Sequence, residues 1–116
     1  MNSRQRIRAI LEHKTADRIP IDLGSMRSSG ISTIAYNKLL KELGKESGQA
    51  KMYDFIQQLA FPQCDIMKHF HIDAIDAGQG FLLSEHDWRT WTLNDGSKCL
   101  IPQFLNVEID EKNTVY

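Results

Sequence analysis

The order of strand, loop of small residues, helix and second strand constrains the fold of this chain more than any other feature of its sequence. Residues 19–23 alternate like a half-buried strand, and the loop of residues 24–30 follows them. A helix is expected from about Ser32 to Leu43, and Gly44 suits the left-handed position that follows a helix. A second strand is expected at residues 72–76. Two strands separated by a helix are typical of parallel sheets, so the sequence predicts an α/β fold.

Two further helices are expected around this unit. Residues 3–13 have apolar side chains at helical spacing, and the opposite, solvent-facing side is expected to carry Arg4, Arg6 and Arg8. Pro62 suits the first position of a short helix whose apolar face continues to Phe70. The state of residues 52–60 is ambiguous from the pattern alone.

The last third of the chain predicts a β-hairpin over residues 88–101. Two runs of strand-forming residues flank Asp95-Gly96, a pair that favours a tight turn. Val107 and Ile109 then alternate with acidic residues. Two parallel strands and a hairpin make an unfinished sheet, so we expect residues 1–116 to be part of a longer chain.

Composition excludes several classes of function. No apolar run exceeds three residues, which excludes a transmembrane helix and a signal peptide. Residues 1–51 carry ten lysines and arginines and five acidic residues, but only one aromatic residue, Tyr36, lies among them. Nucleic-acid binding is therefore not expected. Two cysteines, Cys64 and Cys99, provide no disulfide framework and indicate a reducing compartment such as the cytoplasm.

Arg27 is the residue that most suggests a ligand site. It stands among glycines and serines, including Ser28 and Gly30, between a strand and the start of a helix. Small neighbours let a ligand approach the backbone, and a guanidinium group can bind a carboxylate through two hydrogen bonds. The alternative is an ordinary exposed arginine in a loop.

Asp76 is a weaker candidate catalytic residue, because α/β folds bind ligands at the carboxyl ends of their strands. Its alternative role is to bind backbone amides in the turn of residues 78–80. We expect Asp22 and Asp73 to make structural hydrogen bonds. Gly78-Gln79-Gly80 lacks the dinucleotide fingerprint and the Walker lysine, which argues against nucleotide binding.

No metal site is expected within the chain. The possible ligand side chains form no Cys-x-x-Cys or His-x-x-x-His pair, and two of the histidines are only two residues apart; these side chains are His13, Cys64, His69, His71, His86 and Cys99.

Two stretches resemble the uroporphyrinogen decarboxylase family. Arg18-Ile19-Pro20 followed by Met26-Arg27-Ser28-Ser29-Gly30 is similar to the opening Arg-x-Pro strand and Met-Arg-x-x-Gly loop of that family. Phe70-His71-Ile72-Asp73-Ala74 resembles its Phe-Pro-Leu-Asp-Ala before the next barrel strand. The resemblance implies the N-terminal portion of a TIM (β/α)8 barrel, which takes about 250 residues when complete, with the hairpin as an insertion.

The resemblance also implies roles for individual residues. Arg27 matches the first arginine of the decarboxylase loop, which binds substrate carboxylates. The second arginine of that loop is replaced by Ile31, and the Ser-Asp pair that ends the family's second strand aligns with Gln79-Gly80. These differences and the hairpin favour the divergent branch related to corrinoid and coenzyme M methyltransferases.

In that branch the expected partners are a small-molecule methyl donor or tetrapyrrole and a corrinoid protein. Zinc would be bound by residues outside this chain, and residues 1–116 alone are not expected to be active. True uroporphyrinogen decarboxylation, with Arg27 and Asp76 in new roles, remains a second hypothesis. A small α+β binding module without enzymatic activity is a third.

Overall fold

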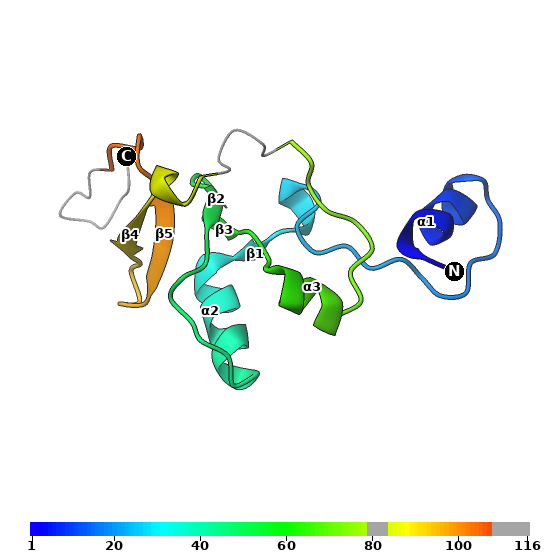
Figure 1. Ribbon diagram of the computed structural model, residues 1–116, viewed down its shortest axis with the longest axis horizontal. Coiled ribbons are helices and arrows are strands. Elements are labelled where there is room, and N and C mark those ends of the chain that lie inside the picture. Colours follow the sequence, from blue (N-terminus) through cyan, green and yellow to red (C-terminus); the bar gives the residue numbers. More distant parts are fainter. Residues whose placement is uncertain (79–83, 108–116) are drawn as a thin grey trace.

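The computed structural model describes residues 1–78 and 84–107. These residues form three α-helices and two small antiparallel sheets in an elongated molecule of 53 × 30 × 28 Å. Helix α1 lies at one end, the β4–β5 hairpin at the other, and α2 and α3 lie between them (Figure 1).

Helix α1 spans Ser3–Leu11 and begins at a capping box formed by Asn2 and Gln5. It ends two residues earlier than predicted, because His13 adopts a left-handed φ of 55° and Lys14 N donates to the carbonyl of Ala9. The prediction that Arg6 faces solvent is wrong. Arg6 is buried and takes part in an ion-pair network, described below.

Helix α2 spans Thr33–Glu42 and follows the short strand β1, Ile31–Ser32. Ser32 caps it by accepting a hydrogen bond from Ala35 N, and Gly44 follows it with a φ of 66°, as the sequence predicts. Its buried face forms the first apolar core with residues from neighbouring segments. The buried members of this core are Tyr36, Leu40, Ala50, Ala60 and Ile66.

Residues 52–60, whose state the sequence leaves open, form two strands. Strand β2 spans Met52–Asp54 and strand β3 spans Leu59–Ala60, and both run antiparallel to their neighbours in a sheet of order β1-β3-β2. Tertiary packing decides this outcome, because Ala60 joins the core beneath α2 and Met52 joins a second core.

Helix α3 spans Cys64–His69, so Pro62 is not its first residue as predicted. Gln63, which precedes the helix, has an extended backbone. Gln63 N donates to the Tyr36 hydroxyl at 3.0 Å, and Pro62 packs so closely on Gly24 that a Cβ there would lie 3.2 Å from Pro62 Cδ.

The two predicted parallel strands are much shorter than expected. Residues 19–23 and 72–76 meet at a single parallel bridge, Asp22 to Ala74, supported by Asp73 N donating to Ile21 O at 2.8 Å. Pro20 has no amide to donate, and Ile21 N donates to the Asp73 carboxylate at 3.0 Å, so a side chain takes the place of a backbone acceptor. The direction of the pair is nevertheless the one that the sequence predicts.

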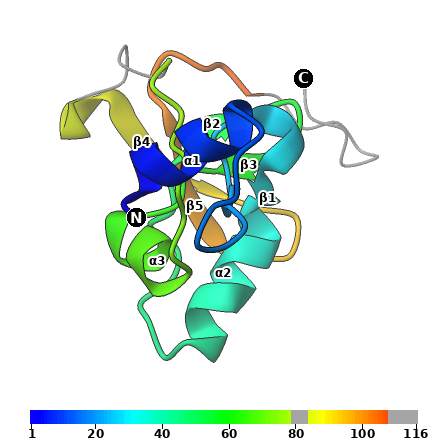
Figure 2. The same ribbon diagram turned by 90° about the vertical axis from the view of Figure 1, so that its right-hand side faces the viewer.

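The hairpin prediction is confirmed. Strands β4, Trp88–Thr92, and β5, Lys98–Pro102, pair antiparallel around Gly96, whose φ is 80°. The hairpin covers the second apolar core, whose buried members are Met52, Leu93, Cys99 and Ile101. Figure 2, which views the molecule from its α1 end, shows α2 and α3 side by side below the sheet strands.

The fold is therefore mixed α/β, with antiparallel sheets and one short parallel contact. Within residues 1–78 and 84–107 no barrel is formed. The predictions for Gln79, Gly80 and Ile109 lie outside the described residues.

Candidate functional site

The loop that carries Arg27 is fixed by hydrogen bonds from its own small residues. The Asp22 carboxylate accepts from Ser25 N at 2.9 Å and from Ser25 Oγ at 2.6 Å. Gly24, with a φ of 90°, donates its amide to Ser29 O at 3.0 Å. Arg27 begins a 3₁₀ turn, Arg27–Ser29, on this closed loop, so its side chain projects from a constrained backbone.

Arg27 forms an ion pair with Asp54, a residue of β2. Asp54 is only 5% exposed and also accepts a hydrogen bond from Gln57 N at 2.8 Å, which fixes the carboxylate. The Arg27 side chain is 71% exposed. One edge of the guanidinium is thus held by a buried acid while its other donors face solvent, an arrangement suited to binding an anion.

Tyr53 places a buried hydroxyl beside this ion pair. The hydroxyl has no hydrogen-bond partner among the described residues, and a Cβ on Gly30 would lie 3.1 Å from it. Burial raises the pKa of Tyr53, the carboxylates of Asp54 and Asp76 raise it further, and Arg27 opposes them. Asp54, Arg27 and Asp76 therefore all lie within electrostatic reach of the Tyr53 hydroxyl.

Asp76 accepts a hydrogen bond from Gly78 N at 2.6 Å. This contact is the alternative that the sequence allowed, an aspartate that binds the amides of the following turn. Ser28 is exposed in the 3₁₀ turn, and Gly30 lies against Tyr53 and Leu59. The structure thus brings Arg27, Gly30 and Asp76 to one end of the Asp22–Ala74 pair, together with Tyr53 and Asp54, which sequence reasoning did not single out.

Asp73, in the segment that pairs with residues 19–23, lies at the centre of a network of charges. Its carboxylate, with no exposed surface, pairs with Arg6 at 2.5 Å and Arg18 at 2.7 Å, and Arg6 also pairs with Asp17 at 2.6 Å. Burial opposes ionisation of Asp73, but hydrogen bonds from Ile21, Ser3, Arg18 and Arg6 outweigh it and lower the pKa. The prediction that Asp22 and Asp73 make structural hydrogen bonds is confirmed.

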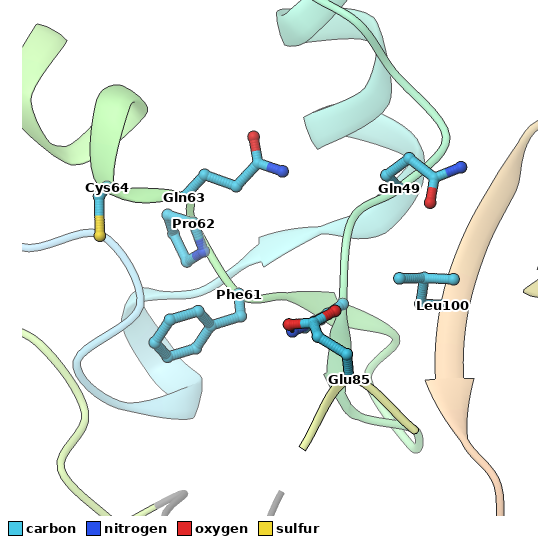
Figure 3. Close-up of a pocket in the computed structure, with 8 residues that line it drawn as sticks. Gln49, Phe61, Pro62, Gln63, Cys64, Glu85 and Leu100 are labelled. Carbon is cyan, nitrogen blue, oxygen red and sulfur yellow. Dashed lines mark hydrogen bonds and ion pairs between the residues drawn. The ribbon is translucent and has the colours of Figure 1, made fainter. Parts of the chain in front are cut away.

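A cavity of about 410 Å³ lies next to the Arg27 loop. Residues 61–64 form one side of it, Gln49 and Leu100 face them, and Glu85 lies at its edge (Figure 3). Phe61 in its wall makes an edge-to-face contact with Tyr53, with ring centroids 6.3 Å apart. The contact between Tyr53 and Phe61 therefore separates the cavity from the residues around Arg27.

Within the described part of the chain, no group of three or more His, Cys, Asp or Glu side chains could hold a metal ion. In the same residues no helix is both long and apolar enough to cross a membrane. No known protein family, curated protein or solved structure matches the chain.

Proposed function

We propose that this chain belongs to a cytoplasmic enzyme of the uroporphyrinogen decarboxylase superfamily, in the divergent branch related to corrinoid methyltransferases, and that Arg27 binds a carboxylate of the substrate. In this proposal residues 1–116 supply the first part of a TIM barrel. Zinc and a corrinoid protein would be bound by other residues of the enzyme. The free thiols of Cys64 and Cys99 fit a reducing compartment.

The observation that carries the proposal is the setting of Arg27. Its guanidinium is largely exposed, is anchored on one side by the buried Asp54, and stands on a loop that follows the first segment of a parallel pair. Ligand sites of α/β barrels are built from such loops, at the carboxyl ends of the strands.

Contacts between the two motif stretches also support the proposal. Arg18, from the Arg-x-Pro stretch, donates to the carboxylate of Asp73, from the second stretch, at 2.7 Å. The two segments of the parallel pair, residues 19–23 and 72–76, carry exposed apolar side chains, with Ile19 83% and Ile75 64% exposed. Parallel sheets normally have both faces covered, so this exposed apolar surface favours a larger sheet than the two segments form.

The proposal is tested by ligand binding to the 116-residue chain. The probe is uroporphyrin, a stable tetrapyrrole with several carboxylates, and binding is followed by its absorbance. We expect Arg27→Ala to weaken binding about 10- to 100-fold, because a hydrogen bond to a charged group contributes about 1.5–3 kcal/mol. Equal affinity of the wild type and Arg27→Ala would overturn the assignment of Arg27.

Two further variants separate binding from folding. Arg27→Ala leaves Asp54 buried without its partner, so the double variant Arg27→Ala/Asp54→Asn should recover stability but not affinity. Arg4→Ala removes the same charge from an exposed position on α1 and should bind uroporphyrin as the wild type does. If Arg4→Ala weakens binding as much as Arg27→Ala, the attraction is a general charge effect and the proposed site is wrong.

Asp76 gives one observation in favour of decarboxylation itself. Its carboxylate lies within electrostatic reach of Tyr53 and on the same end of the molecule as Arg27, where pyrrole N–H groups would need an acceptor. Incubation of the enzyme with uroporphyrinogen decides between the two activities. Formation of coproporphyrinogen would favour the decarboxylase, and its absence would favour the methyltransferase branch.

A further inference from the structure

The cavity beside the Arg27 loop has an apolar interior and a polar edge. Phe61, Pro62 and Leu100 supply apolar surface from two different segments of the chain. Figure 3 shows Phe61 and Pro62 on one side and Leu100 on the other, with Glu85 between Phe61 and Leu100. A volume of about 410 Å³ is within the range of pockets that bind small organic molecules.

Lys51 supplies a positive charge to this cavity. Its ammonium group lies 2.7 Å from a Glu85 carboxylate oxygen and 5.4 Å from the centroid of the Trp88 ring. The Lys51 side chain is 29% exposed, whereas Glu85 is 78% exposed. Because an exposed acid contributes little to such a pair, another carboxylate can replace Glu85 at small energetic cost.

Two carboxamides complete the polar edge. Gln49 and Gln63 line the cavity, and neither side chain makes a hydrogen bond to another residue that the structure describes. The backbone of Gln63 is fixed by its amide, which donates to the Tyr36 hydroxyl. The site therefore offers one cation, two amide groups and an apolar interior.

We propose that this cavity binds a small aromatic carboxylate. The ring would pack between Phe61, Pro62 and Leu100, and the carboxylate would pair with Lys51 in place of Glu85. The amides of Gln49 and Gln63 would bind polar substituents of the ring. This site does not use Arg27 and does not depend on the function proposed above.

Cys64 provides a direct readout of occupancy. It lines the cavity and is exposed, whereas Cys99 is fully buried in the second apolar core, so the folded chain has one accessible thiol. The probes are 2-naphthoate and its neutral isostere 2-naphthamide, and the rate of Cys64 alkylation by iodoacetamide gives the affinity of each. We expect naphthoate to protect Cys64 and to bind about tenfold more tightly than the amide, because the charged contact is lost in the amide.

Three variants test the chemistry of the site. Lys51→Met should remove the preference for the acid, and Glu85→Gln should improve naphthoate binding about two- to fivefold by removing its competitor. Lys14→Met is the matched control, since Lys14 also pairs with a glutamate at 2.7 Å but lies on the segment after α1. It should change neither affinity.

Several results would overturn the proposal. These are an absence of protection by either compound at millimolar concentration, equal affinity for acid and amide, and an acid preference that survives in Lys51→Met. Arg27→Ala distinguishes the two proposed sites. It should leave naphthoate protection of Cys64 unchanged, and a loss of protection would assign the acid to Arg27 instead.

Discussion

Asp73 is a buried carboxylate on which two arginines and a backbone amide converge. Removing one partner of a buried ion pair leaves the other charge without compensation. We therefore expect Asp73→Asn to lower the free energy of unfolding by about 3 kcal/mol, measured by urea denaturation followed by circular dichroism. Glu12→Gln is the control, because Glu12 pairs with Arg8 and Lys14 on the surface and its loss should have a much smaller effect. Equal stability of Asp73→Asn and wild type would contradict the prediction.

The same carboxylate predicts how stability depends on pH. The pKa of Asp73 is lower in the folded chain than its ordinary value, as is the pKa of Asp17 beside Arg6. Such groups stabilise the fold above their unfolded pKa of about 4, and that stabilisation is lost as pH falls toward the folded pKa. We expect the free energy of unfolding to decrease as the pH is lowered below about 4. The decrease should be less steep in Asp73→Asn. Parallel pH profiles for the two chains would rule out this role.

Comparing Tyr53 with Tyr36 measures how much a hydrogen-bond partner of a tyrosine hydroxyl contributes to the free energy of unfolding. The Tyr53 hydroxyl has no partner among the described residues, whereas the Tyr36 hydroxyl accepts a hydrogen bond from Gln63 N at 3.0 Å. We expect Tyr53→Phe to be neutral or to stabilise the chain by up to about 1 kcal/mol, and Tyr36→Phe to destabilise it by about 1 kcal/mol. Urea denaturation of both variants is the measurement. A destabilised Tyr53→Phe would show that its hydroxyl has a partner in solution.

At the scale of elements, local signals predict some structures and tertiary contacts decide the others. The end of α2 at Gly44 and the turn at Gly96 need a left-handed backbone, which glycine adopts without strain, so the sequence alone predicts them. The β2–β3 pair has no such signal. Its residues become strands because Ala60 and Met52 are buried in two different cores. The strand expected at 19–23 does not form in full, because Ile21 N donates to the Asp73 carboxylate and not to a backbone carbonyl.

Asn37 joins α2 to two other segments and is buried. Its side-chain nitrogen donates to Lys98 O at 2.9 Å and to Ser97 Oγ at 3.1 Å, and its oxygen accepts from Gly48 N at 3.3 Å. We expect Asn37→Ala to destabilise the chain by about 2–3 kcal/mol, because the buried side chain of Asn37 makes three hydrogen bonds that the variant loses. Fluorescence of Trp88 and Trp91 in the hairpin should report the change during urea unfolding. Lys41→Ala, on the exposed side of the same helix, should change stability little.

At the scale of the whole molecule, the candidate site combines residues that are close in the sequence with residues that come from distant segments. The sequence indicates Arg27 as a candidate because its small neighbours lie within a few residues of it. It does not indicate Asp54 and Tyr53, because they reach Arg27 from β2, a segment whose local pattern is ambiguous. The burial of Arg6 depends in the same way on Asp73, which is 67 residues away along the chain. Long-range contacts of this kind follow from packing and not from periodicity.

The two apolar cores are joined closely enough that we expect them to unfold together. Ala50, in the first core, accepts a hydrogen bond from Leu100 N of β5 at 2.8 Å, and β2 carries Met52 of the second core while pairing with Ala60 of the first. Cys99 reports on the second core, because burial raises the pKa of its thiol to about 11 and hides it from reagents. In a Cys64→Ser chain, alkylation of Cys99 should be slow in water and should rise at the same urea concentration at which the helical circular dichroism is lost. Labelling at a clearly lower concentration would mean that the hairpin core opens by itself.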